Sequence, residues 1–168
     1  MKEYNFVING EKEYEQKMQK IEAVYNQYMT DCGYYLYAVK EACINALCNC
    51  NDMDNIVINV SVWVSDDDIE TTVAADTNDF SPEAIRAEYQ MIADKYSKMD
   101  WGDYEALLPH YEQHRGIWNM LFACDYIFFA ADGKKVTLVT KYPFNECYIK
   151  KIGSLVSRFL IEKSGVIF

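Results

Sequence analysis

The chain has 168 residues, a length that suits one domain, and hydrophobic residues make up 51% of it. This apolar content excludes a disordered or low-complexity protein. The formal net charge is −10 at pH 7, and because phosphate contacts need clustered lysine and arginine, we expect no face that binds a nucleic acid directly. Residues 133–168 differ from the rest, with seven basic and two acidic side chains, which suggests an interaction surface.

Six cysteines are present, but nothing else in the sequence indicates secretion. The start of the chain lacks the apolar stretch of a signal peptide. The longest apolar run, residues 117–131, is interrupted by Asn119 and Asp125 and does not reach the length of a membrane span. We therefore expect a cytoplasmic protein without membrane association, whose thiols are reduced. A structural zinc site is the alternative, and the absence of a C-x₂-C spacing disfavours it.

A strand and two helices are predicted for the first part of the chain. Residues 4–8 are typical of a short strand, and in residues 11–30 apolar side chains recur at steps of three and four, as in an amphipathic helix. Gly33 is expected to close this helix in the left-handed conformation. Residues 34–50 form the second predicted helix. One side of it is apolar, and the other carries a polar stripe at i, i+4 and i+8: Glu41, Asn45 and Asn49.

The middle of the chain predicts a hairpin followed by a helix. Residues 56–64 alternate apolar and polar side chains, as in a half-buried strand, and residues 69–75 return as its partner. The next helix is expected over residues 83–99, after a serine cap at Ser81 and a proline at the first helical position. Residues 100–113 are expected to be irregular.

A second hairpin and a final helix are predicted for the rest. A short helix over residues 116–124 leads into strands at 126–131 and 135–142, which the Asp132-Gly133 turn joins. The apolar spacing in residues 145–162 predicts the last helix. This order of elements predicts an α+β fold, a two-layer α/β sandwich with a mixed sheet covered by helices on one face.

Three short segments carry motifs on these elements. The sequence A-V-K-E-A-C-I-N-A-L, residues 38–47, lies on the second helix. The sequence V-A-A-D-T-N-D-F-S-P-E, residues 73–83, leads from a strand into a loop, and H-R-G-I-W-N-M, residues 114–120, begins a short helix. In this order they resemble the N-box (E-x-x-x-N-A), G1 box (D-x-G-x-G-F) and G2 box (G-R-G-L) of the Bergerat-fold (GHKL) ATPases. The closest type is the small anti-sigma-factor serine kinases, and the likeness covers roughly residues 4–142.

The resemblance implies a histidine-kinase-like ATPase fold that binds ATP and Mg²⁺. Asn45 looks like the family's metal ligand, a role that suits an amide oxygen. Glu41, one turn earlier, looks like its general base. Asp76 would accept a hydrogen bond from the adenine amino group. The alternatives are a solvated helix face for the first two residues and an ordinary turn aspartate for the third.

The phosphate side of the implied site departs from the family pattern. Arg115 and Gly116 at a helix start suit a phosphate, and Asn49 extends the polar stripe toward the nucleotide. Asn78 stands at the first glycine position of the G1 box, the second glycine is missing, and His114 replaces the first glycine of the G2 box. A metal held by His110 and His114 is an alternative without an evident third ligand. Residues 83–113 would be the nucleotide lid, and the four tyrosines of this segment suggest a lid that is packed shut and not mobile.

Two functions follow from the resemblance, and both stay open. The first is an ATP-binding regulator of transcription that phosphorylates a serine of an antagonist protein and sequesters a sigma factor. The second is a pseudo-ATPase that serves as a protein-interaction module without turnover. The catalytic domain of a sensor kinase is a weaker third. We expect one domain over residues 1–168, with a core at 1–144 and an added helix at 145–168 that packs on the core or on a second subunit of a homodimer.

Overall fold

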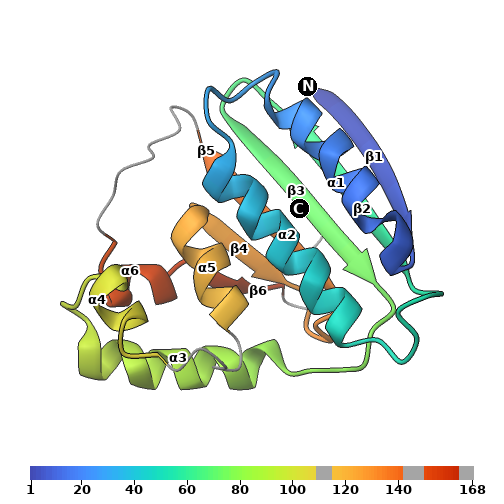
Figure 1. The fold of residues 1–168 in the computed structure, drawn as a ribbon. Helices are drawn as coiled ribbons and strands as arrows, with labels where there is room; N and C mark the ends of the chain where they lie inside the picture. Colours follow the sequence, from blue (N-terminus) through green and yellow to red (C-terminus); the bar gives the residue numbers. More distant parts are fainter. Residues whose placement is uncertain (109–114, 142–149, 163–168) are drawn as a thin grey trace.

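The computed structural model describes residues 1–108, 115–141 and 150–162. Its elements run as a strand, two helices, a hairpin, three helices, a second hairpin, and a short helix with a last strand (Figure 1). In chain order they are β1 (Lys2–Asn9), α1 (Glu11–Tyr25), α2 (Gly33–Cys48), β2 (Val57–Val64), β3 (Asp68–Ala75), α3 (Pro82–Tyr96), α4 (Trp101–Glu105), α5 (Arg115–Ala123), β4 (Tyr126–Phe129), β5 (Lys135–Lys141), α6 (Ile152–Val156) and β6 (Phe159–Ile161).

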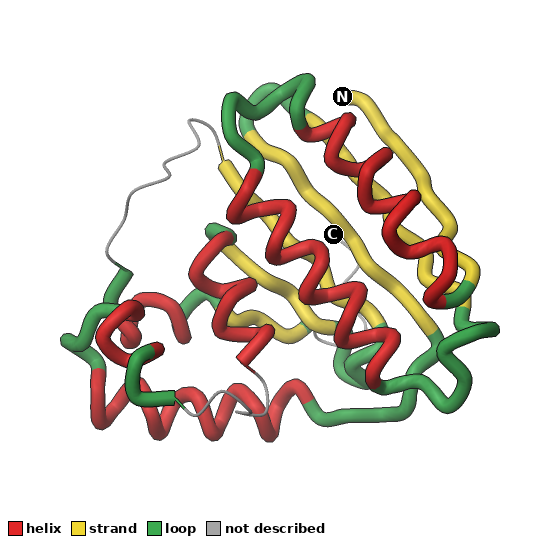
Figure 2. The backbone as a smooth tube through the Cα atoms, in the orientation of Figure 1, coloured by secondary structure: helices red, strands yellow, loops and turns green. Residues whose placement is uncertain are grey.

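Six strands form one mixed sheet in the order β1-β2-β3-β5-β4-β6. All neighbouring strands are antiparallel except β4 and β6, which are parallel. Helices α1, α2 and α5 lie across one face of this sheet (Figure 2). The predicted α+β class, with a mixed sheet and a helical layer, is therefore confirmed. None of the helices in the described ranges is long and apolar enough to cross a membrane.

The alternating pattern of β2 decides which side of the sheet faces the helices. Ile58, Val60 and Val62 are buried, while the side chains between them are exposed or half-buried. The hairpin register places Val64 opposite Ile69, so the apolar side chains of β3 join the same core. Burial of this continuous apolar face is the main stabilising contribution that fixes the register.

Two buried tyrosines attach the helices to the centre of the sheet. The Tyr25 hydroxyl of α1 lies 2.7 Å from the Thr71 hydroxyl of β3. Tyr35 of α2 donates to the Leu138 carbonyl at 2.9 Å and lies 3.0 Å from the same threonine oxygen. Burial raises the pKa of both phenols. Because a buried hydroxyl without a partner is costly, these bonds fix how α1 and α2 sit on the sheet.

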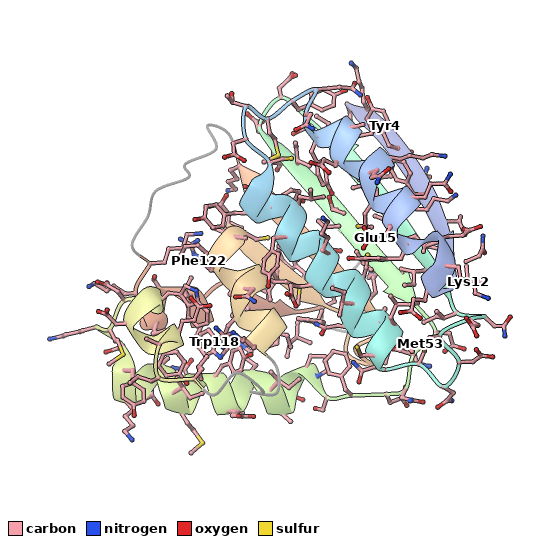
Figure 3. The ribbon with its side chains drawn as sticks, in the orientation of Figure 1. Tyr4, Lys12, Glu15, Met53, Trp118 and Phe122 are labelled. Carbon is pink, nitrogen blue, oxygen red and sulfur yellow. The ribbon has the colours of Figure 1, made fainter. Side chains whose placement is uncertain are left out.

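An aromatic stack joins α3 and α4 to α5. The Trp118 indole of α5 lies between that helix and the α3–α4 segment (Figure 3). It stacks on Tyr89 with ring centroids 4.0 Å apart and on Trp101 at 5.5 Å. All three side chains are buried. The described part of the predicted lid, residues 83–108, is therefore packed into the core and is not a free flap.

Two local predictions are wrong. Gly33 does not close α1: that helix ends at Tyr25, and Gly33 begins α2, with its N–H bonded to the Asp31 carboxylate at 2.8 Å. Residues 101–105, expected to be irregular, form α4, because Trp101 and Tyr104 are buried against the aromatic stack. Tertiary packing outweighs the weak local propensity of so short a segment.

In the described part of the predicted helix over residues 145–162, only Ile152–Val156 is helical, and the prediction is wrong on both sides of it. Helix α6 ends at Val156, and residues 159–161 form β6, parallel to β4. Residues 145–149 lie outside the described residues. Phe159 and its apolar neighbours fit either period, and pairing decides between them: the N–H of Ile127 bonds the Arg158 carbonyl at 3.0 Å, and the N–H of Glu162 bonds the Phe129 carbonyl at 2.8 Å. Pairing with β4 satisfies backbone groups that a helix would leave open.

The five cysteines in the described ranges are free thiols, and Cys147 lies outside them. Cys43 is fully buried, and this burial raises the pKa of its thiol to about 12. We expect thiol titration in denaturant without reductant to find all six cysteines free. In the native protein, exposed Cys48 should react first and buried Cys43 and Cys124 last, because burial raises the pKa of both thiols and only the thiolate reacts. A count below five in denaturant would contradict reduced, structural thiols.

Candidate functional site

The three motif segments meet around one cavity of about 310 Å³. Helix α2 forms one wall, the loop after β3 another, and the start of α5 a third. The inner faces of β3, β4 and β5 close the floor. The volume lies at the lower end of the range of small-molecule sites, about 300–1,000 Å³. The fold therefore brings together segments that are far apart in the sequence.

The cavity has apolar walls and basic groups at its rim. Its apolar lining comes from helix, loop and strand side chains: Ala42, Ala46, Val73, Ala75, Phe80, Ile85, Ile117, Met120, Phe129 and Val136. Its polar lining includes Asn45, Asn49 and Thr77, together with the two cations Arg115 and Lys134. No described lining residue is acidic. This lining suits a ligand with a flat apolar part and an anionic part.

The polar stripe of α2 reaches the cavity through two of its three residues. Asn45 and Asn49 line it, and the Asn49 side-chain amide donates to the Asn45 carbonyl at 2.8 Å. The Asn49 carbonyl accepts the N–H of Asn78 at 2.8 Å, which ties the end of α2 to the loop after β3. Asn78 itself is exposed and does not line the cavity. Asn78 therefore contributes to the site by holding the loop after β3 against the end of α2.

Glu41 lies beside the cavity, against the start of α5. Its Oε2 atom is 2.5 Å from the position that a Cβ would take on Gly116. A larger residue at position 116 would therefore require the Glu41 side chain to move. A hydrogen bond to Glu41 raises the pKa of Tyr37, one turn earlier on α2. The structure thus brings together Glu41, Asn45 and Gly116, but Glu41 is not a lining residue.

Asp76 does not point into the cavity. Its side chain is 93% exposed, and its carboxylate pairs with the Lys134 ammonium at 2.8 Å. This bond lowers the pKa of Asp76. Asp79 lies 3.4 Å from the same ammonium. An adenine contact by Asp76 therefore needs the carboxylate to turn toward the cavity.

Arg115 lines the cavity from the first residue of α5. Its guanidinium pairs with the Glu105 carboxylate of α4 at 2.9 Å, and both side chains are partly exposed. The pair links the predicted lid segment to the start of α5. Residues 109–114, with His110 and His114, lie outside the described residues.

Three lining residues, Phe80, Gly133 and Lys134, are not among the predicted site residues. Phe80 packs edge-on against Phe129, with centroids 5.7 Å apart, and its ring covers Gly133. Gly133 has a φ of 75°, which favours glycine, and a Cβ there would meet the Phe80 ring. Lys134 follows in the same turn. The Asp132-Gly133 signal located the turn, but only the pairing of β3 with β5 places it at the cavity.

The described residues fit a nucleotide with Mg²⁺ in their chemistry. The apolar walls suit a base, and Arg115 and Lys134 suit phosphates. Within the described ranges, no group of three His, Cys, Asp or Glu side chains could hold a metal. Mg²⁺ needs no such group, because it keeps several waters and binds substrate phosphates, and the Asn45 amide oxygen would be its protein ligand here.

Comparison of the sequence with protein-family models and with curated proteins finds no match. The geometry of the cavity is the basis for the function that follows.

Proposed function

We propose that the chain is an ATP-binding regulatory protein that resembles the anti-sigma-factor serine kinases. One observation supports this most: three motif segments, recognised separately in the sequence, meet at one cavity of suitable size and charge. Asn45, Asn49, Arg115 and Gly116 line it. Four of the seven predicted site residues thus line one cavity.

The proposed roles follow from the chemistry of each group. Asn45 would hold Mg²⁺, and Arg115 with the N–H groups at the start of α5 would bind phosphates. Asp76 would accept the adenine amino group once its carboxylate turns toward the cavity. Glu41 would orient the attacking hydroxyl of a serine, which makes it the catalytic base. The protein partners would be an antagonist protein that carries this serine and a sigma factor, in the cytoplasm.

A second candidate is a pseudo-ATPase that binds protein partners without turnover. The pairing of Asp76 with Lys134 favours it, since the predicted adenine acceptor is engaged elsewhere. The missing glycines of the G1 box point the same way. The two functions differ in whether ATP is bound and turned over.

Binding is tested by thermal unfolding with ATP and Mg²⁺. A ligand at about one hundred times Kd should stabilise the fold by about 2.7 kcal/mol. We expect weak binding, because Asn78 and His114 replace glycines that let the backbone approach the phosphates. Asp76→Asn should abolish the stabilisation by ATP, because the neutral amide oxygen is a weaker acceptor for the adenine amino group than the carboxylate, and the amide NH₂ group, where it faces the base, opposes another donor.

Asp66→Asn is the matched control for this test. Asp66 is exposed in the turn between β2 and β3, at the other end of β3 from the cavity. This variant should respond to ATP as the parent does. If millimolar ATP with Mg²⁺ leaves the melting temperature of the parent unchanged, the nucleotide proposal fails and the interaction module takes its place.

A further inference from the structure

We infer that Lys134 is an anion-binding residue of the cavity. Its ammonium is paired with Asp76 and Asp79, and a phosphate-bearing ligand displaces these carboxylates. The inference rests on the proposed function for the identity of the ligand, a nucleoside polyphosphate. It adds to the site Lys134, which lies outside the three motifs. It also implies that competition between the ligand and two carboxylates, Asp76 and Asp79, sets the affinity for the ligand.

The charged side chains that line the cavity are the first observation in support of an anion site. The chain as a whole is acidic, with 16 basic against 26 acidic side chains. Yet the two charged groups among the lining residues, Arg115 and Lys134, are both basic. They come from different elements, the start of α5 and the turn after β4. Each cation is already paired with a carboxylate, Arg115 with Glu105 and Lys134 with Asp76, so an anion in the cavity would compete for two cations.

The ion pairs of Lys134 are the second observation in support of an anion site. Its ammonium lies 2.8 Å from Asp76 and 3.4 Å from Asp79, and these carboxylates raise its pKa, so it stays protonated at neutral pH. Both carboxylates are largely solvated, with side chains 93% and 80% exposed. Exposed ion pairs contribute little to stability. A phosphate in the cavity, with more charge and less water around it, competes favourably for the ammonium.

The backbone of Lys134 is fixed by hydrogen bonds, so only its side chain has to move for the ammonium to exchange the carboxylates for a phosphate. Its N–H bonds the Asp132 carboxylate at 2.9 Å, and its carbonyl accepts the N–H of Ala75 at 3.0 Å. The turn is therefore fixed to the end of β3. Only the flexible four-carbon stem has to turn from the loop toward the ligand.

Titration calorimetry with inorganic pyrophosphate, without divalent cations, isolates this effect from recognition of the base. Lys134→Gln should weaken pyrophosphate binding at least tenfold, while Lys134→Arg should keep most of it. Lys135→Gln is the matched control, because Lys135 does not line the cavity and pairs with Glu162 at 3.0 Å. It should change the affinity less than twofold. Melting curves establish that each variant is folded.

Asp76→Asn should tighten pyrophosphate binding several-fold, because it releases Lys134. The gain should vanish in the Lys134→Gln background, which a general change in surface charge would not do. Equal affinities of the parent and Lys134→Gln for pyrophosphate would overturn the inference, even if the parent binds ATP.

The same titrations separate this inference from the proposed function. If the protein binds pyrophosphate through Lys134 but does not bind ATP, the anion site is supported and the nucleotide proposal is refuted. ATP binding that Lys134→Gln leaves unchanged would support the nucleotide and refute the role of Lys134. A parent that binds neither ligand would refute both.

Discussion

Trp118→Ala is expected to destabilise the protein by about 3–5 kcal/mol, the range for truncating a buried tryptophan. The indole is 1% exposed and stacks on Tyr89 and Trp101. Its removal leaves a cavity where α3, α4 and α5 meet, and these elements cannot close over it without moving the sheet. The free energy of unfolding from urea titration measures the loss.

Trp63→Ala provides the matched control for this truncation. Trp63 is 37% exposed on β2, among the side chains that alternate with the core positions. Its loss should cost about 1 kcal/mol or less. Similar losses in the free energy of unfolding for both variants would contradict the conclusion that the α3–α4 segment is part of the folded core. If that segment were a free lid, truncation of Trp118 would cost little stability.

Glu41→Ala is expected to leave ATP binding within about twofold and to lower phosphoryl transfer by about 10²–10⁴-fold, the usual contribution of a positioned base. The carboxylate lies beside Asn45 and Gly116 but does not line the cavity. Its loss should therefore affect the chemical step and not the ground-state complex. Phosphate transfer from labelled ATP to water or to a serine-bearing partner measures this step, and calorimetry measures binding.

Glu15→Ala, at an exposed position on α1, is the control for loss of a glutamate. It should change neither quantity. If Glu41→Ala loses ATP binding along with turnover, Glu41 holds the start of α5 in place and is not the base. If the parent itself shows no transfer above background, the pseudo-ATPase function is the correct one.

The sequence predicts most of the helices and strands because their patterns are long and agree with their surroundings. The alternation in β2, the serine cap of α3 and the Asp132-Gly133 turn each specify one local structure. The Ser81 hydroxyl, for example, accepts the N–H of Ala84 at 3.1 Å, as a cap should. The motifs also locate the cavity, since they lie at the ends of these elements.

The remainder depends on pairings that no local pattern encodes. Phe159 and its neighbours fit a helical period, and the free edge of β4 makes them a strand. Lys134 reaches Asp76 only because β3 and β5 are neighbours in the sheet. A motif match names Asp76 as a candidate, but the orientation of its carboxylate depends on this cation from a distant turn.

A crystal structure of the protein with Mg²⁺ and a non-hydrolysable ATP analogue tests nucleotide binding most directly. We expect the analogue in the cavity between α2 and α5, with Asn45 on the metal and Arg115 at the phosphates. The Lys134 ammonium should have left Asp76. An empty cavity at millimolar analogue, or an analogue bound elsewhere on the protein, would contradict the nucleotide site.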